Sequence, residues 1–421
     1  MVPQILNFAR WLWQRLAPEK ARYFVHLGLQ RGCSWANDLK LEFMDALESF
    51  WHILDHRFAR WPGQAPLRVV GLFSASHGIS RGAWLTCRAL EHLGLPYVKI
   101  DASSLILGSK DSSFLDGRAL GWVIQMNPPE LYEVVRHTDP LAMKGPRYGY
   151  WAWELPIAPE SWRGADEFVT EIWATSAFTA RSFRAFNKPV RPMPHPIVLA
   201  DYERVKEAPK RAPFAAITLF DFQSSVDRKN PMGAISVFKT AFGEDPTVCL
   251  TIKTQNGHLF PKLLSELRLA ATSNITLIDE VWTYDRVLTE IKASDVLISL
   301  HRAEGFGLTM AEAMALGTPV LATGWSGNLD FMDDSSAILT PFSLVPVADS
   351  QGFYQGQHWA DADLDFAVSR LKRLRTDPVF ARQLSKAAAE AVGGNLSPEV
   401  WFSKFPLGLR LRILASALRR G

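Results

Sequence analysis

The sequence has 421 residues, and its 46 Lys and Arg against 43 Asp and Glu leave a net charge of only +3. This length corresponds to about two or three domains, and the small charge excludes a protein that holds nucleic acid by its overall field. Hydrophobic residues make up 48% and charged residues 21% of the chain, which excludes a disordered or collagenous protein and indicates a folded soluble enzyme.

We expect the protein to work in the cytoplasm. Its cysteines, Cys33, Cys87 and Cys249, lack the paired spacing of a zinc site or a disulfide framework, which favours a reducing compartment. The first apolar runs are interrupted by Asn7 and Arg10 before they reach the length of a signal peptide core. No later stretch approaches the roughly 18 consecutive apolar residues that a membrane-spanning helix needs.

Residues 1–65 are predicted to form a helical extension of mixed polarity. Trp11, Trp13 and Leu16 stand among basic residues, as in an amphipathic basic helix. Such a helix either buries its tryptophan face against the neighbouring domain or lies on an anionic membrane surface. The sequence leaves both interpretations open.

From residue 66 the sequence changes to apolar runs separated by Gly, Pro and Asn, each followed by a segment of helix length. This alternation is typical of a parallel sheet with crossover helices. We therefore predict a first doubly wound α/β domain over residues 66–200. Its strands are expected at 67–74, 97–101, 121–126 and 169–175.

The segment 201–213 is charged, contains prolines and lacks apolar periodicity, so we interpret it as a domain linker. The alternation then resumes in a second α/β domain, residues 214–395, and a basic amphipathic helix is predicted over 396–421. Two such domains in series place a ligand cleft between them, beyond the carboxyl ends of their strands. In the second domain, strands are expected at 214–220, 247–252, 275–278, 295–300 and 319–323, with helices beginning near Pro231, Phe260, Thr283 and Leu308.

The most informative stretch runs from His301 to Met332. A buried strand ends in a loop with Gly305 and Gly307, and a helix then extends from about Leu308 to Leu316. Glycine allows close backbone approach, and a helix N-terminus offers free N–H donors with a positive dipole. This arrangement predicts a phosphate-binding loop that faces the cleft.

Glu304 stands just before this loop and Glu312 about one turn inside the helix, so their carboxylates are expected on the order of 10 Å apart. A carboxylate only accepts hydrogen bonds when ionised, so beside a diphosphate it is suited to hydroxyl groups rather than to phosphate oxygens. A nucleotide sugar supplies hydroxyls on both sides of its diphosphate, in the ribose and in the sugar ring.

The segment EGFGLTMAEAMALGTPVLAT, with Glu304 and Glu312 separated by seven residues, resembles glycosyltransferase family 4, whose members are retaining enzymes of the two-Rossmann-domain GT-B type. The resemblance covers residues 214–340 and extends to the first domain only by layout. It implies that Glu304 contacts the donor sugar and Glu312 the ribose. It also implies that backbone N–H groups of the intervening residues bind sugar and diphosphate. These residues are Gly305, Phe306, Gly307, Leu308 and Thr309.

The diphosphate of such a donor needs cations that face the phosphate-binding loop from other strand ends of the second domain. Lys229 falls where the resemblance places a phosphate-binding lysine. The family's arginine, expected a few residues earlier, is missing from 221–223. Arg228 and Lys253 are the candidates to replace it.

In the first domain, a loop with Gly78 and Gly82 follows the first predicted strand, and its glycine spacing is not that of a dinucleotide-binding fingerprint. The loop resembles the acceptor-side loop of the family, where His77 and Arg81 are candidates to touch acceptor or phosphate. Asn127 and Glu154 are expected at later strand ends, where either can bind a hydroxyl of donor or acceptor. Nearby aromatic residues either stack on sugar rings or pack in the core: Tyr148, Tyr150, Trp151, Trp153 and Trp162.

We expect no metal site and no cofactor. The acidic residues Asp361, Asp363 and Asp365 fall in a region expected to be helical, where a solvated helix face is the simpler interpretation. Lysines and helix ends are then expected to stabilise the leaving diphosphate.

These features predict a metal-independent glycosyltransferase that moves a hexose from a UDP- or GDP-linked donor to a glycan or lipid-linked acceptor, in bacterial polysaccharide biosynthesis. Basic segments near both ends of the chain suggest contact with the inner face of the cell membrane. A sugar-nucleotide epimerase or a glycan phosphorylase on the same architecture is the alternative, and a non-enzymatic nucleotide-sugar sensor is another. A retaining glycoside hydrolase fits less well, because its carboxylates stand about 5 Å apart with no phosphate site between them.

Overall fold

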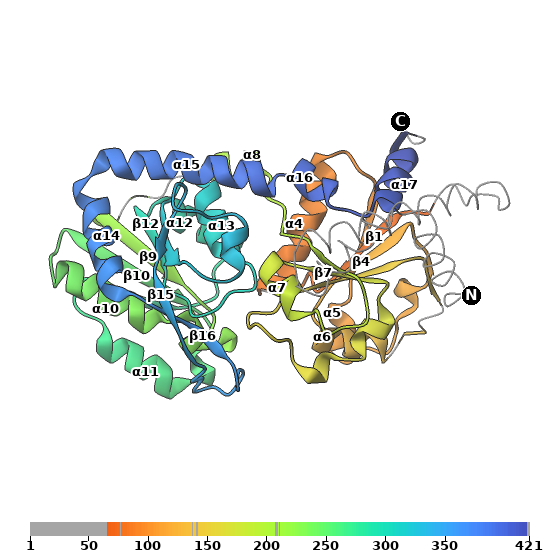
Figure 1. Ribbon diagram of the computed structural model, residues 1–421, viewed down its shortest axis with the longest axis horizontal. Helices are drawn as coiled ribbons and strands as arrows, with labels where there is room; N and C mark the ends of the chain where they lie inside the picture. The colour runs from red at the N-terminus through yellow and green to blue at the C-terminus, as the bar shows by residue number, and fades with distance from the viewer. Residues whose placement is uncertain are drawn as a thin grey trace, which may run out of the picture.

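The computed structural model describes residues 65–418, apart from residues 76, 137, 140, 141, 207, 208 and 210. The predicted helical extension at residues 1–65 therefore lies, but for its last residue, outside the described residues. Two parallel six-stranded sheets lie side by side, each with helices on both faces (Figure 1). The predicted class, two Rossmann-like α/β domains, is confirmed.

The first sheet contains six parallel strands, and its central strand β4 is buried along its whole length. Such buried strands produce the continuous apolar runs seen in the sequence. The predicted strands did not include β6 (Arg147–Trp151), β8 (Val190–Pro192) or the short pair β3 (Gly117–Arg118) and β5 (Met143–Lys144). In spatial order the strands are β2 (Tyr97–Asp101), β1 (Leu67–Gly71), β4 (Gly121–Gln125), β6 (Arg147–Trp151), β7 (Glu171–Ala174) and β8 (Val190–Pro192).

The second sheet is also six-stranded and parallel, and five of its strands lie within two residues of the predicted bounds. The sixth, β14, has three residues and was not predicted. In spatial order the strands are β11 (Ile275–Asp279), β10 (Val248–Thr254), β9 (Phe214–Leu219), β12 (Val296–Ser299), β13 (Val320–Thr323) and β14 (Ile338–Thr340).

Helices connect the strands of each sheet and cover its faces. The four helices predicted near Pro231, Phe260, Thr283 and Leu308 begin within one residue of those positions. In the first domain the helices are α4 (Gly78–His92), α5 (Ser103–Ile106), α6 (Pro128–Val135) and α7 (Ala177–Ser182). Helix α8 (Leu199–Glu203) lies in the linker region, and the second domain contains α9 (Val226–Lys229), α10 (Pro231–Phe242), α11 (Pro261–Ala270), α12 (Tyr284–Lys292), α13 (Leu308–Ala315), α14 (Leu364–Thr376) and α15 (Pro378–Leu396).

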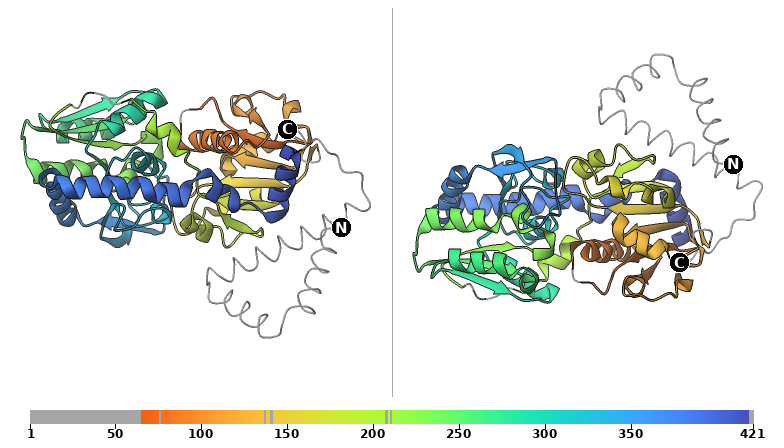
Figure 2. Two further views of the ribbon diagram at one scale, coloured as in Figure 1. Left: turned by 90° about the horizontal axis from the view of Figure 1, so that it is seen from above. Right: turned by 90° about the horizontal axis from the view of Figure 1, so that it is seen from below.

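The chain returns to the first domain at its C-terminal end. Helix α15 runs along the second domain, and α16 (Pro398–Ser403) and α17 (Leu407–Leu418) lie over the first (Figures 1 and 2). Trp401, Phe405, Leu409 and Ile413 pack with the residues of β1 and β6 in one cluster. The helix predicted over 396–421 is thus interrupted, and its apolar face is part of the first domain's core.

An antiparallel hairpin, β15 (Phe342–Pro346) and β16 (His358–Ala362), follows the second sheet. Its connecting loop contacts both domains, since Tyr354 and Gln357 hydrogen-bond to Glu154 and Ile157 of the first. No helix in the described part of the chain is long and apolar enough to cross a membrane.

Candidate active site

The candidate site lies at the carboxyl ends of the strands, where the two domains meet. Strand β12 leads into Glu304, and the segment after β9 leads into helix α9, which carries Arg228 and Lys229. From the first domain, β6 leads into Glu154. The fold therefore brings together four of the residues predicted from separate parts of the sequence.

Glu304 is a buried carboxylate next to two cations. It accepts a hydrogen bond from the ammonium group of Lys229, and Arg228 Nη1 lies 3.5 Å from the same oxygen. Burial acts to raise the pKa of Glu304, but the charges of Lys229 and Arg228 outweigh burial and lower that pKa to about 2. Glu304 is therefore ionised at physiological pH.

The two cations have different surroundings. Arg228 is buried and donates to the carbonyl oxygens of Ser224 at 3.0 Å and Ala303 at 2.8 Å. Lys229 keeps 23% of its side chain exposed, and burial lowers its pKa against the opposing effect of Glu304. Lys229 is thus the more accessible cation for an incoming anion, while Arg228 is fixed behind it.

Residues 305–307, hereafter the glycine loop, connect Glu304 to α13. Gly307 has a φ of +94°, which side-chain-bearing residues rarely adopt. A Cβ atom at Gly305 would lie 3.2 Å from the carbonyl oxygen of Trp153, so a larger residue would push the two backbones apart by a few tenths of an ångström. Glycine is therefore favoured at both predicted positions.

Phe306 is buried and packs inside the protein, with its ring centroid 5.1 Å from that of His195 and 5.0 Å from that of Phe331. Leu308 and Thr309 are half-buried at the start of α13. The first N–H groups of a helix have no partner within the helix, and with the helix dipole they favour an anion. A phosphate site beside Lys229 is consistent with this geometry.

Glu312 lies in a second cluster one turn into α13. Its Oε1 accepts hydrogen bonds from Arg81 Nε at 3.0 Å, from the Tyr284 hydroxyl, and from the Tyr202 hydroxyl at 3.4 Å. The Arg81 guanidinium also stacks on the Tyr284 ring, 3.4 Å from its centroid. The carboxylate expected to bind ribose is therefore contacted from the first domain.

The rest of the predicted acceptor-side loop is held by helix α4 and its neighbours. His77 caps the helix, with Nδ1 accepting from the Ser80 N–H at 3.3 Å, and its ring is exposed. Gly78 faces open space, whereas a Cβ atom at Gly82 would lie 2.4 Å from the ring of His195. Gly82 is thus required for packing, and His77 and Gly78 are accessible.

Asn127 and Glu154 lie at neighbouring strand ends, as predicted, but have different contacts. The Asn127 side chain accepts a hydrogen bond from the Ala152 N–H at 2.8 Å, which braces the end of β6. Glu154 Oε2 accepts from the Tyr354 hydroxyl at 3.0 Å, and its Oε1 lies 3.9 Å from Arg228 Nη2. Of these two residues, the structure brings Glu154 to the Glu304 cluster.

Lys253 belongs to a different group of side chains. It is the last but one residue of strand β10, its Nζ donates to Gln255 Oε1 at 3.3 Å, and this Nζ lies 5.9 Å from the ring centroid of Trp282. Burial lowers the pKa of Lys253 against the opposing charge of Asp221. None of these contacts involves Glu304.

The aromatic run of the first domain is mostly core. Tyr148, Tyr150, Trp151 and Trp162 are buried, and only Trp153 stays half-buried. The Trp153 ring packs 5.4 Å from that of Tyr354 on the hairpin loop. The four buried rings therefore pack in the core and do not stack on sugar rings.

The acidic residues 361, 363 and 365 do not form the single helical face that was expected. Asp361 lies on strand β16 and Asp363 caps α14, because the antiparallel hairpin extends to residue 362. Within residues 65–418 as described, no three His, Cys, Asp or Glu side chains gather in a group able to hold a metal ion.

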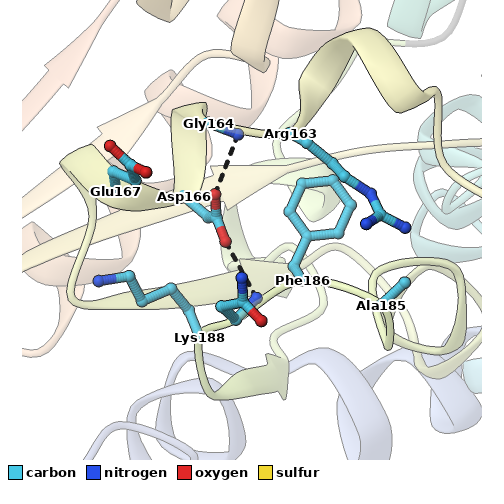
Figure 3. Close-up of a pocket in the computed structure, with 8 residues that line it drawn as sticks. Arg163, Gly164, Asp166, Glu167, Ala185, Phe186 and Lys188 are labelled. Carbon is cyan, nitrogen blue, oxygen red and sulfur yellow. Dashed lines mark hydrogen bonds between the residues drawn. The ribbon is translucent and has the colours of Figure 1, made fainter.

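A cavity of about 260 Å³ lies elsewhere in the first domain (Figure 3). Its lining residues precede β7 and β8, so it lies at the amino ends of these strands: Arg163, Gly164, Asp166, Glu167 and residues 185–188. Asp166 there accepts hydrogen bonds from the N–H groups of Gly164 and Asn187. The candidate site instead lies at the carboxyl ends of the strands, so this cavity is not part of it.

Comparison with known families identifies the second domain. Residues 197–390 match the model of a family described as Family 4 Glycosyltransferase in conflict systems. The second domain is a family 4 glycosyltransferase domain. The match contains Lys229 and both glutamates, and it confirms the resemblance predicted from the segment that begins at Glu304. No curated protein sequence matches the chain.

Solved structures share the two-domain arrangement of this chain. HepE of Anabaena, in complex with UDP and glucose, is 12% identical, with 80% of this chain and 97% of that chain covered and a TM-score of 0.56. Sucrose-phosphate synthase of Thermosynechococcus elongatus is 15% identical, with 80% and 96% covered and a TM-score of 0.56. At these identities the similarity establishes the fold, and the predicted GT-B type is confirmed.

A third similar structure, TarM of S. aureus with UDP bound, is 14% identical, with a TM-score of 0.49. The match covers 69% of the present chain and 55% of that one, so the chain spans about half the length of TarM.

Several residues of the candidate site were not predicted. Tyr202 from the linker and Tyr284 from α12 reach Glu312, and Tyr354 from the hairpin loop reaches Glu154. Thr175 and Ser176 contact the glycine loop from the end of β7. These residues have no motif spacing, and only the tertiary fold brings them to the cleft.

Proposed function

We propose that this glycosyltransferase moves a hexose from a UDP- or GDP-linked donor to a glycan or lipid-linked acceptor, with retention of configuration. The main support is the pairing of Glu304 with Lys229 beside the start of α13. There, a buried carboxylate, an accessible cation and helix N–H groups stand next to one another. In a bound nucleotide sugar, the carboxylate would accept hydrogen bonds from the sugar hydroxyls, and the cation would neutralise the charge of the diphosphate. The helix N–H groups would donate to the phosphate oxygens.

Donor binding is proposed to redistribute the Glu304 contacts. The diphosphate takes the ammonium of Lys229, which frees Glu304 to accept hydrogen bonds from sugar hydroxyls. Glu312 accepts hydrogen bonds from the ribose. Arg228 stays fixed by the carbonyl groups of Ser224 and Ala303 and supplies positive charge to the same region.

In the transfer step, the bond between the anomeric carbon and the diphosphate oxygen breaks and the acceptor oxygen bonds to the same carbon. For retention, the acceptor approaches from the face that the diphosphate leaves, and its hydroxyl proton passes to the departing phosphate oxygen. Lys229 and the N-terminus of α13 stabilise the charge that develops on the leaving group. Glu154 stands on the first-domain side, where the acceptor is expected.

We propose that this electrostatic work needs no metal ion. Arg228, Lys229 and the α13 N-terminus supply positive charge to the diphosphate region from the chain itself. Transfer rates in EDTA equal to those in Mg²⁺ are expected. A rate that EDTA abolishes and Mg²⁺ restores would contradict this part of the proposal.

The direct test is product analysis with purified protein and nucleotide sugars, with and without saccharide acceptors. UDP-glucose is a sensible first donor, because HepE, which shares the fold, was solved with UDP and glucose. We expect free nucleoside diphosphate and an α-linked product from an α-linked donor only when an acceptor is present. A converted nucleotide sugar without acceptor would indicate an epimerase, and phosphorolysis of a glycan would indicate a phosphorylase.

We also propose that helix α17 binds the membrane surface. Such contact would fit a role in bacterial surface polysaccharide assembly from the cytoplasmic side. The α17 leucines at positions 407, 411, 414 and 418 are spaced by four, three and four residues and are all exposed, beside Arg410. Basic residues beside such an apolar stripe favour an anionic lipid surface. Leu411→Ser with Leu414→Ser should abolish binding to phosphatidylglycerol vesicles, whereas Leu269→Ser, at an exposed position on α11, should not.

A further inference from the structure

Three buried hydroxyl groups of the first domain point at one carbonyl group of the second. Thr175, Ser176 and Thr179 place their hydroxyl oxygens 3.3, 2.6 and 3.0 Å from the Gly305 carbonyl oxygen. All three side chains are at most 2% exposed. We call this set the hydroxyl cluster. It sits at the end of β7 and in the first turn of α7.

The hydrogen atoms of the hydroxyl cluster satisfy two backbone acceptors. A carbonyl oxygen has two lone pairs and each hydroxyl has one hydrogen to donate. Ser176 and Thr175 can therefore donate to both lone pairs of the Gly305 oxygen. Thr179 can then donate to the Trp153 carbonyl oxygen, which lies 2.9 Å from its hydroxyl. The cluster thus joins the residue after Glu304 to the residue before Glu154.

Glu304 itself is held from its own domain. Its N–H donates to Ser326 Oγ at 2.9 Å, and its carbonyl oxygen accepts from the Gly327 N–H at 3.0 Å. The hydroxyl cluster supplies the corresponding constraint from the first domain. Gly305 favours this contact, because a Cβ atom there would lie 3.2 Å from the Trp153 carbonyl oxygen.

We infer that Thr175, Ser176 and Thr179 are positioning residues that set Glu154 relative to Glu304 when the domains close. This inference rests on the proposed function, since it assigns these carboxylates to the acceptor and donor sides of one reaction. The cluster touches neither substrate directly. It acts by fixing the backbone beside Glu154 and beside Glu304, the two carboxylates that lie near Arg228.

This role predicts an effect on turnover rather than on nucleotide binding. The nucleotide is expected to bind to Lys229 and Glu312 of the second domain, which the hydroxyl cluster does not contact. The relative placement of Glu154 and Glu304 matters only when the acceptor attacks the donor. A misplacement of about 1 Å can cost on the order of 100-fold in rate.

The test uses the full chain with Thr179→Val, which keeps the side-chain shape and removes the hydroxyl. We expect kcat to fall about 10-fold to 100-fold, with the donor KM and the nucleotide Kd within about twofold of wild type. Thr179→Ser, which keeps the hydroxyl, should restore kcat to within about threefold. Thr175→Val provides a second variant with the same expected direction if Thr179→Val does not fold.

Thr138→Val is the matched control. Thr138 is a buried threonine of the same domain, and its hydroxyl donates to the Val134 carbonyl oxygen at 2.8 Å, a contact that involves neither the glycine loop nor the backbone beside Glu154. Its kcat should stay near wild type. Normal turnover in Thr179→Val, or an equal loss in Thr138→Val, would overturn the positioning role while wild-type transfer still supports the proposed function. Wild-type protein that transfers no sugar from any nucleotide sugar would overturn both.

Discussion

Arg81 of the first domain donates from Nε to Glu312 Oε1 of the second at 3.0 Å, and this contact occupies one oxygen of the carboxylate that is proposed to bind ribose. The Glu312 side chain is only 5% exposed, and the Tyr284 hydroxyl bonds to the same oxygen. A ribose hydroxyl that binds there must compete with a guanidinium. Domain contact and donor binding are thus linked through one residue.

Arg81→Gln is expected to tighten nucleotide binding. Removing an ion pair worth about 1 kcal/mol frees Glu312 and lowers the Kd about fivefold. Arg88→Gln is the control, because Arg88 lies on the same helix and pairs with Asp201 away from Glu312. Calorimetric titration with UDP and GDP measures both. Weaker binding by Arg81→Gln would mean that Arg81 holds the nucleotide instead of competing with it.

Glu304→Gln should lower the transfer rate by about two orders of magnitude or more, while nucleotide affinity stays near the wild-type value. The amide keeps the shape of the side chain but loses the charge that faces the reacting sugar, an interaction expected to matter most in the transition state. Steady-state kinetics with a fixed acceptor separate kcat from KM. Unchanged turnover would remove Glu304 from the mechanism.

Lys229→Gln and Lys253→Gln distinguish the two lysines predicted to bind phosphate. Lys229 lies beside Glu304 and the start of α13, so its loss should raise the Kd for nucleoside diphosphates about 10-fold to 100-fold. Lys253, which bonds to Gln255, should change the Kd less than about threefold. The reverse order would move the diphosphate site to the end of β10.

His195 makes the protein sensitive to acid. Burial, with the charge of Arg81, lowers the pKa of His195 to about 4, and within the described residues its Nδ1 has no hydrogen-bond partner. Between pH 6.5, the ordinary pKa of histidine, and pH 4, only the unfolded state binds the proton. The stability from neutral His195 is therefore complete above pH 6.5 and declines by up to about 3 kcal/mol as the pH falls to 4.

Urea unfolding at several pH values between 7 and 4 measures this effect. Wild-type protein should lose more stability over the range than His195→Gln, whose amide does not titrate, and the difference should approach about 3 kcal/mol. Equal slopes for the two proteins would contradict the assignment to His195.

The sequence was sufficient to predict most strands and the residues of the glycine loop, because buried parallel strands and a glycine-bounded helix have local patterns. Strand β8, with three residues and a proline, and β14, with three residues, carry too little periodicity to be recognised. The helix at 396–421 was predicted as a separate basic element, and its core contacts through Trp401 and Leu409 became evident only in the fold.

The residues that complete the site could not be predicted for a different reason. Tyr202 and Tyr284 reach Glu312 across sequence separations of 110 and 28 residues, and Ser176 reaches Gly305 across 129. Serines, threonines and tyrosines are common in most sequences and form no spacing pattern of their own. Their role follows from how closely the two domains approach each other, which no local signal specifies.

The most direct test of the proposed nucleotide-sugar site is thermal unfolding of the purified protein with UDP, GDP, ADP and their sugar conjugates, in the presence of EDTA. A ligand at about 100 times its Kd adds roughly 2.7 kcal/mol of stability, which raises the Tm by several degrees. We expect one nucleotide to do this without metal, and Lys229→Gln to lose the shift. No shift with any nucleotide would contradict a phosphate site at Lys229 and α13.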